Sequence, residues 1–187
     1  MGSVKRLTCF LLLLLATNTY AANYDIERTS DGPFSFEIMG TKLNEGSSLQ
    51  RESILFNNKT SPVKLLSHTM KVKYNDRGFR FAGTTKAKIG EKIKALQIRT
   101  IQYDIFGRHM KNLANTQPKD FAAGEITIDG EWRASEHEIA EFLTSVTYVA
   151  RVRFGDGTQW TFNSDNLQMA LSTLRLEQKI GEDESKK

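Results

Sequence analysis

Residues 66–74 alternate between two faces with a period of two, which is the period of a β-strand rather than of a helix. One face carries Leu66, His68, Met70, Val72 and Tyr74, and the other carries Ser67, Thr69, Lys71 and Lys73. The alternation resumes at Phe79 and Phe81 after the turn sequence NDRG. We therefore predict a hairpin in which Tyr74 pairs with Phe79. In the same register Val72 pairs with Phe81. Because this period dominates most of the chain, it predicts an all-β fold.

A second hairpin is predicted in residues 149–163, VARVRFGDGTQWTFN. A two-residue loop would put the apolar faces of its strands on opposite sides, whereas a three-residue loop at 155–157 matches them. The matched pairs are Phe154 with Thr158, Val152 with Trp160, and Ala150 with Phe162. This loop requires a left-handed residue, which Gly157 supplies. In this register Tyr148, Ala150, Val152 and Phe154 share one face, and Trp160 packs in the core.

Two further strands are predicted at 93–106 and 124–132. In the first, the apolar phase shifts between Ile98 and Ile101, which suggests a β-bulge. After the second, Ser135 and Glu138 have the spacing of a helix capping box.

The period changes after residue 163, where apolar residues recur at helical spacing. They are Leu167, Ala170, Leu171 and Leu174. Asp165 with Gln168 has the spacing to cap the start of this helix. We expect one C-terminal helix, residues 164–181, that packs on the domain or docks a partner.

The first 22 residues have the order of a secretory signal peptide. Lys5 and Arg6 precede an apolar run at 10–16, and Thr19-Tyr20-Ala21 forms a small-x-small exit. The only cysteine, Cys9, precedes the apolar run, so the exported chain is expected to carry no lipid and no disulfide. Export without disulfides favours a bacterial periplasm or a secreted protein, with no transmembrane anchor.

The predicted organisation has five parts. They are a signal peptide at 1–22, a lead-in with at most one strand at 23–50, a β-sandwich domain at 51–163, a C-terminal helix at 164–181 and a charged tail at 182–187. The exported part, about 165 residues, is near the usual size of one domain.

Four segments resemble the immunoglobulin-like β-sandwich modules of uncharacterised exported bacterial proteins. They are NNKTSPVKL at 57–65, GEKIKALQI at 90–98, YDIFG at 103–107 and YVARVRFGDGTQW at 148–160. The resemblance implies an immunoglobulin-like antiparallel β-sandwich, here with a C-terminal α-helix. It implies no catalytic residues, and the Cys…Trp…Cys arrangement of antibody domains is absent.

Charge is distributed unevenly along the chain. Cations dominate residues 64–99 and are Lys64, Lys71, Lys73, Arg77, Arg80, Lys86, Lys88, Lys92, Lys94 and Arg99. An acidic block follows, made of Asp120, Glu125, Asp129, Glu131, Glu136, Glu138 and Glu141. Such asymmetry can steer an anionic partner, and the alternative is a solvated outer face of strands.

Chemical motifs are few. The chain has no Gly-x-Ser-x-Gly elbow, and GDGT at 155–158 is explained as a turn. His137 and Glu141 could share a helix face, but they supply two ligands where zinc normally needs three or four. His68 lies on an apolar strand face, where a hydrogen-bonded core histidine is the expected role, and His109 could join the other histidines only through the fold.

These observations predict a non-enzymatic exported interaction module, with no cofactor, that binds another envelope or extracellular macromolecule. A protein partner is the first expectation. The alternative is a ligand-binding protein that uses the basic region for an anionic glycan, lipid headgroup or nucleic acid. The candidate binding residues are Lys71, Lys73, Arg77, Lys86, Lys88 and Trp132.

Overall fold

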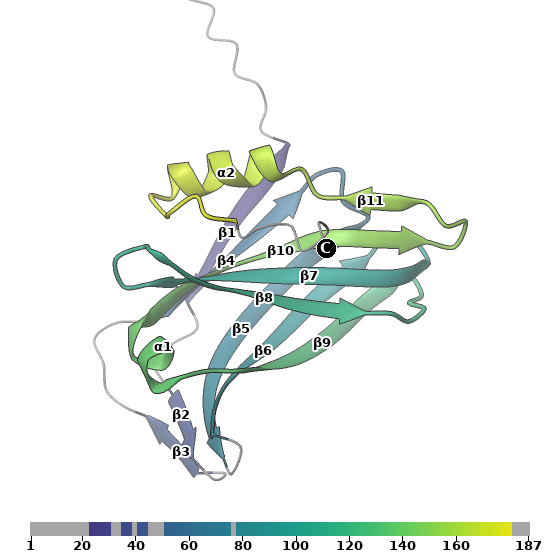
Figure 1. The fold of residues 1–187 in the computed structure, drawn as a ribbon. Coiled ribbons are helices and arrows are strands. Elements are labelled where there is room, and N and C mark those ends of the chain that lie inside the picture. Colours follow the sequence, from purple (N-terminus) through teal and green to yellow (C-terminus); the bar gives the residue numbers. More distant parts are fainter. Residues whose placement is uncertain (1–22, 31–34, 39–40, 45–50, 76–77, 181–187) are drawn as a thin grey trace, which may run out of the picture.

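The computed structural model describes residues 23–30, 35–38, 41–44, 51–75 and 78–180 (Figure 1). The predicted signal peptide, Arg77 and the charged tail at 182–187 lie outside the described residues.

The described chain forms two β-sheets and two short helices, so the predicted all-β sandwich is confirmed (Figure 1). Sheet A contains, in spatial order, β1 (Tyr24–Ser30), β4 (Glu52–Asn58), β10 (Phe142–Phe154), β7 (Ile93–Asp104) and β8 (His109–Gln117), and β11 (Gln159–Thr161) also pairs with β10. Sheet B contains β3 (Thr41–Asn44), β2 (Ser35–Ile38), β5 (Val63–Asn75), β6 (Gly78–Ile89) and β9 (Gly124–Arg133). The helices are α1 (Glu136–Glu141) and α2 (Ser164–Thr173). Pairing is antiparallel except for the parallel pairs β4–β10 and β2–β5.

Apolar side chains of the described residues form three buried clusters. Two lie between the sheets, one around Leu65, Leu96 and Val152 and the other around Val72 and Phe81. The third lies on the outer side of sheet A, where α2 covers it. It contains Ile54, Phe56, Ile101, Tyr103, Val146, Tyr148, Ala150, Leu167, Ala170 and Leu171. The central strands of sheet A, β4, β7 and β10, therefore carry buried side chains on both faces.

The predicted register of both hairpins is confirmed. Tyr74 pairs with Phe79 across β5 and β6, and Val72 pairs with Phe81. Val152 pairs with Trp160 across β10 and β11, and the Phe154 and Phe162 amides bond to the Thr158 and Ala150 carbonyls, respectively, both at 3.0 Å. Gly157 has a φ of 90°, as the three-residue loop requires.

The faces of β10 differ from the prediction because this strand contains a bulge. Opposite β7, Val149 pairs with Ile98 and Arg151 with Gln97, which leaves Ala150 as the extra residue. Tyr148 and Ala150 face α2, whereas Val152 and Phe154 pack between the sheets. The four residues predicted to share one face therefore lie on two faces.

The bulge predicted in β7 between Ile98 and Ile101 is wrong. Both strand pairings of β7 run without interruption through these residues. The apolar phase changes because Ile98 packs between the sheets, whereas Ile101 packs under α2. A strand whose other face becomes covered partway along its length shows the same shift in apolar alternation as a strand with a bulge.

The lead-in was predicted to carry at most one strand, but it supplies three, namely β1, β2 and β3. The sandwich therefore begins at Tyr24 rather than at residue 51. The sequence signal of β1 is weak because it is an edge strand with two apolar contacts, Tyr24 stacked on Phe56 at 4.6 Å and Ile26 packed on the cluster under α2. The edge strand β8 was also missed, since only Leu113 is buried in it.

Helix α2 is shorter than predicted and ends at Thr173. Its N-cap is Asn163, whose side chain accepts from the Asp165 amide at 2.8 Å, rather than the Asp165–Gln168 pair. At the other end, the Leu176 amide bonds to the Leu171 carbonyl and the Arg175 amide to the Ser172 carbonyl. These bonds form a Schellman motif. Its left-handed position is occupied by Arg175, with a φ of 58°, in place of the usual glycine. The chain after this motif is therefore not helical.

Candidate functional site

The outer face of sheet B gathers most of the predicted binding residues. On β5 and β6 the core-facing residues are buried, so the alternate residues point away from the core. The cations on this side are Lys64, Lys71, Lys73, Arg80, Lys86 and Lys88, and together they are called the basic face below. Four of them, all lysines, are exposed; Lys73 and Arg80 are half-buried.

Like charges lie directly opposite one another in the basic face. Lys64 pairs with Lys88 across β5 and β6. Farther along, Lys73 pairs with Arg80, and Arg80 pairs in turn with Arg133 of β9. Three cations therefore stand side by side on neighbouring strands. Directly opposed like charges destabilise a sheet, so this arrangement carries an electrostatic cost.

The acidic residues of β9 lie beside the basic face because β9 is the neighbour of β6. Glu125 pairs with Lys88, and Glu131 forms a salt bridge with Lys73 at 3.2 Å. Asp129 accepts a hydrogen bond from the Thr84 hydroxyl at 2.7 Å. The acidic residues of β9 and the basic face, separate in the sequence, therefore form adjacent stripes on one surface. Within the described chain, Lys71, Arg80, Lys86 and Lys88 take part in no salt bridge.

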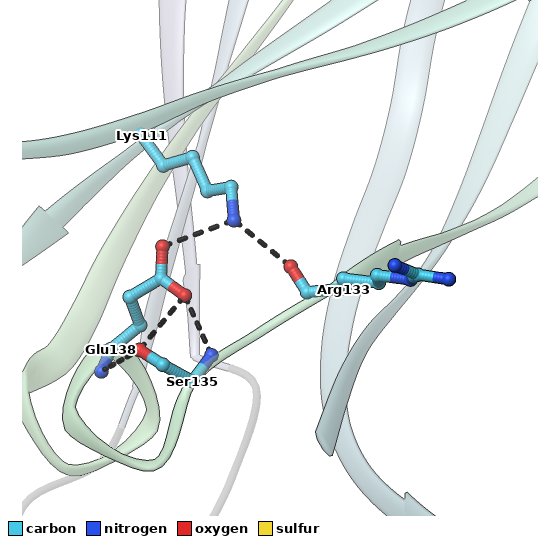
Figure 2. A network of polar contacts seen from close by, with 4 residues as sticks. All are labelled: Lys111, Arg133, Ser135 and Glu138. Atoms are coloured by element: carbon cyan, nitrogen blue, oxygen red, sulfur yellow. Dashed lines mark hydrogen bonds and ion pairs between the residues drawn. The ribbon is translucent and has the colours of Figure 1, made fainter. Parts of the chain in front are cut away.

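The end of this surface is held by a polar network around α1 (Figure 2). The Lys111 ammonium donates to the Arg133 carbonyl at 2.9 Å and to Glu138 Oε1 at 3.0 Å. Ser135 and Glu138 form the predicted capping box, with the Ser135 amide donating to Glu138 Oε2 at 2.7 Å. Burial acts to raise the pKa of Glu138, but the bonds from Ser135 and Lys111 outweigh it, so the pKa is lowered. The network anchors the backbone of Arg133 while its guanidinium points away in Figure 2.

Trp132 does not join the basic face. It pairs with buried Phe81, on the core side of sheet B, and packs against the cluster around Val72. Its indole Nε1 donates to the Ala114 carbonyl at 3.0 Å. A Cβ on Gly130 would stand 2.5 Å from the Trp132 ring, so the indole lies over a position that only glycine allows. Its position is explained by packing.

The remaining cations of the basic region lie elsewhere. Lys92 forms a salt bridge with Asp120 at 3.7 Å, and Lys94 is exposed on β7 of sheet A. Arg99 of β7 lies on the side of sheet A that α2 covers, where it is half-buried. The sequence block therefore divides between two opposite sides of the sandwich.

The histidines do not converge on one site. His68 is buried, and its Nδ1 lies 2.8 Å from the Thr85 hydroxyl, as expected of a hydrogen-bonded core histidine. Burial lowers its pKa from 6.5 to about 4. His137 meets Glu141 at 3.5 Å on α1, and His109 Nε2 lies 3.0 Å from Asn112 Oδ1. Among the described residues, no group of three or more His, Cys, Asp or Glu side chains is arranged to hold a metal ion.

A buried polar row crosses sheet A and was not anticipated. Ser53 of β4 pairs with Ser145 of β10, which pairs with Gln102 of β7, and all three are fully buried. Two residues farther along β10 and β7, the Thr147 and Thr100 hydroxyls form a hydrogen bond at 3.0 Å. In the sequence these residues occupy ordinary strand positions, and only the pairing of three distant segments aligns them.

Comparison with known proteins adds no relative, since no protein-family model, curated protein or solved structure matches the chain. In the described residues, neither helix has the length and apolar character that crossing a membrane requires.

Proposed function

We propose that this protein is an exported, non-enzymatic interaction module, and that it binds an acidic surface of another envelope or extracellular protein through the basic face of sheet B. The observation that carries the proposal is the row formed by Lys73, Arg80 and Arg133 on three neighbouring strands. Opposed like charges destabilise the isolated domain, and an acidic partner would relieve that repulsion.

The stripe of acids on β9 favours a protein partner over a uniform polyanion. Asp129 and Glu131 lie one strand away from the basic face, so a polymer with negative charge along its whole surface would meet repulsion there. A protein surface can present acids to the basic face and cations to β9. Complementary stripes would also set the orientation of the complex.

Export is part of the proposal and rests on the sequence of residues 1–22. The exported chain is expected to begin at Ala22 or Asn23 without a lipid. Intact mass of the protein recovered outside the cytoplasm measures this directly. A chain that retains Cys9 with an acyl group would contradict it.

An immunoglobulin-like identity is also a proposal. The two packed sheets and their antiparallel hairpins support it. The parallel pairs β4–β10 and β2–β5 are departures from the antiparallel sheets of such domains.

The binding proposal is tested by charge reversal on matched strands. A photo-crosslinking residue at Thr69, exposed on β5 beside the basic face, identifies the partner in intact cells. The purified partner is then titrated with wild-type protein, with Lys71→Glu/Lys86→Glu and with the control Lys94→Glu, which reverses an exposed lysine of sheet A. The double variant should lose at least tenfold in affinity, and the control should bind as the wild type does.

Salt separates this proposal from its alternatives. Affinity for the partner should fall as ionic strength rises, because exposed charges are screened. Equal binding by the double variant at low salt would contradict the proposal. Salt-sensitive binding to heparin or to anionic vesicles, with no protein crosslinked at Thr69, would instead favour the polyanion alternative and overturn the protein partner.

A further inference from the structure

A cavity of about 290 Å³ lies on the other side of the molecule, between sheet A and the start of α2. Strands β7, β10 and β11 line it together with the first two turns of α2. Two arginines, Arg99 and Arg151, line this cavity, and none of the described residues that line it is acidic. Hydroxyl-bearing Tyr148 and Ser164 and apolar Phe162 and Ile180 also line it.

The bulge in β10 is what places both arginines on one side of sheet A. Tyr148 faces α2 and pairs with Arg99 of β7. Regular alternation from Tyr148 would direct residue 151 toward the interior between the sheets. The extra residue at Ala150 restores Arg151 to the side of α2, so Ala150 and Arg151 both line the cavity. Bulges commonly re-aim a side chain next to a functional site.

The Arg99 side chain is half-buried beside the cavity, so its guanidinium loses part of its hydration. For Arg99 this loss is visible, because its Nε is buried and has no hydrogen-bond partner among the described residues. A buried donor without an acceptor is unfavourable, and the effect is stronger when the group is charged. An oxyanion in the cavity would supply the acceptor that Arg99 Nε lacks.

We propose that this cavity is a carboxylate-binding site, with Arg99 and Arg151 as its cationic ligands. The planar fork of a guanidinium matches the two oxygens of a carboxylate, and the low polarity of Phe162 and Ile180 strengthens such a contact. The site lies on the opposite side of the sandwich from the basic face, so it does not depend on the function proposed above.

Two sources of carboxylate are available to this site. One is a free anion of the surroundings. The other is the chain itself, because Ile180 lines the cavity and the sequence continues as Gly181-Glu182-Asp183-Glu184, with three carboxylates within four residues. The shared chemistry is a cluster of carboxylates, and the experiment distinguishes the two sources.

The test uses the full exported chain and citrate as the probe. Citrate binding is measured by calorimetry for the wild type and for a variant with a neutral tail, Glu182→Gln/Asp183→Asn/Glu184→Gln. The same titration is repeated with Arg99→Gln and with Arg151→Gln in each background. Arg153→Gln is the matched control, because Arg153 is an exposed arginine of β10 that does not line the cavity.

A second readout accompanies the titration, namely the NMR shifts of the arginine Nε–Hε groups, in spectra that also show whether each variant is folded. If the tail is the occupant, neutralising it should shift the Arg99 and Arg151 signals and leave the Arg153 signal unchanged. Citrate should then bind at least tenfold more tightly, because the tail no longer competes for the site. If a free anion is the occupant, both backgrounds should bind citrate equally and each cavity substitution should weaken binding at least tenfold. Absence of citrate binding together with unmoved arginine signals would overturn the site, as would binding that survives both cavity substitutions.

Discussion

The outer faces of the two sheets differ in what covers them. On sheet A, α2 packs over aromatic and aliphatic residues of β4, β7 and β10, so these strands are buried on both sides. On sheet B, β5, β6 and β9 alternate between core residues and a charged surface that no described helix covers (Figure 1). One sheet is an internal layer of the molecule, and the other presents one face to solvent.

The two outer faces therefore contribute to different properties, one to folding stability and the other to association. The covered face of sheet A contributes to the free energy of folding, because burying an aromatic or aliphatic side chain stabilises a protein by about 1.5–3 kcal/mol. The open face of sheet B carries charged side chains. Exposed charges contribute little to the free energy of folding, but they affect the rate and specificity of association. Substitutions on the two faces should therefore separate stability from binding.

The largest effect is expected on the covered face. Phe56→Ala removes a side chain that is 1% exposed. Its ring centroid lies 4.6 Å from that of Tyr24 and 5.4 Å from that of Phe162. We expect a loss of about 3–5 kcal/mol in the free energy of unfolding, measured with urea. Lys86→Ala on the open face is the control and should change it by less than about 0.5 kcal/mol. Similar losses for both variants would refute the contrast between the faces.

The core side of sheet B should give a pH-dependent effect through His68. Its pKa of about 4 in the folded protein lies below its ordinary value of 6.5. As the pH falls from 6.5 to about 4, His68 is protonated in the unfolded chain but not in the folded chain. Acidification therefore lowers the free energy of unfolding, by on the order of 3 kcal/mol in total.

Urea unfolding of wild type and His68→Asn from pH 7 down to pH 4.5 measures the effect as a difference in slope. The variant should show a flatter dependence than the wild type. Parallel curves would show that His68 does not contribute. His137→Asn, at an exposed position of α1, controls for the loss of one histidine.

The hairpin that brings Phe162 back to the covered face should depend on Gly157. Its φ of 90° suits glycine, and a β-branched residue tolerates it poorly. Gly157→Val should lower stability by about 1–2 kcal/mol or more. Gly155→Val is a matched control, because Gly155 lies in the same loop without a positive φ and without neighbours within 4 Å of an added Cβ. Equal effects of the two substitutions would argue against strain at Gly157.

A smaller gain is expected where α2 ends over sheet A. Arg175 occupies the left-handed position of a Schellman motif that ordinarily favours glycine. Arg175→Gly should raise the melting temperature, corresponding to about 0.5–1 kcal/mol, because the positive φ no longer strains a side chain. A lower melting temperature would indicate that the Arg175 side chain stabilises the motif by contacts of its own.

The smallest effect is expected in the row of cations on the open face. Arg80→Glu places an acid between Lys73 and Arg133 and should stabilise the domain by about 0.2–1 kcal/mol. The gain should shrink in 1 M salt, where the Debye length is about 3 Å. The same variant should bind the partner less well, and a variant both less stable and unaffected in binding would contradict the proposed role of this row.

Much of the fold could be predicted from the sequence where the signal is local. Near their turns, the registers of the β5–β6 and β10–β11 hairpins were predictable because a short loop fixes pairing once the alternating faces must match. Farther from its turn, the β5–β6 pairing shifts register between Leu65 and Ser67, which the sequence did not reveal. The capping box at Ser135 and the left-handed Gly157 were predictable for the same reason, since their partners lie within a few residues. That Lys71, Lys73, Lys86 and Lys88 share a face follows from alternation within one hairpin.

Tertiary structure decided what depends on residues distant in the sequence. The apolar phase of β7 suggested a bulge there, but only the packing of α2 explains it, and the bulge itself lies in β10 at Ala150. The acids of β9 come to lie beside the basic face because β9 pairs with β6, and Trp132 turns inward because Gly130 leaves room for its ring. Arg99 and Arg151 are 52 positions apart in the sequence and share a cavity only through strand pairing and one extra residue. Alternation determines the two faces of a strand, but which face is covered, and by what, is settled by contacts between segments that the chain brings together only on folding.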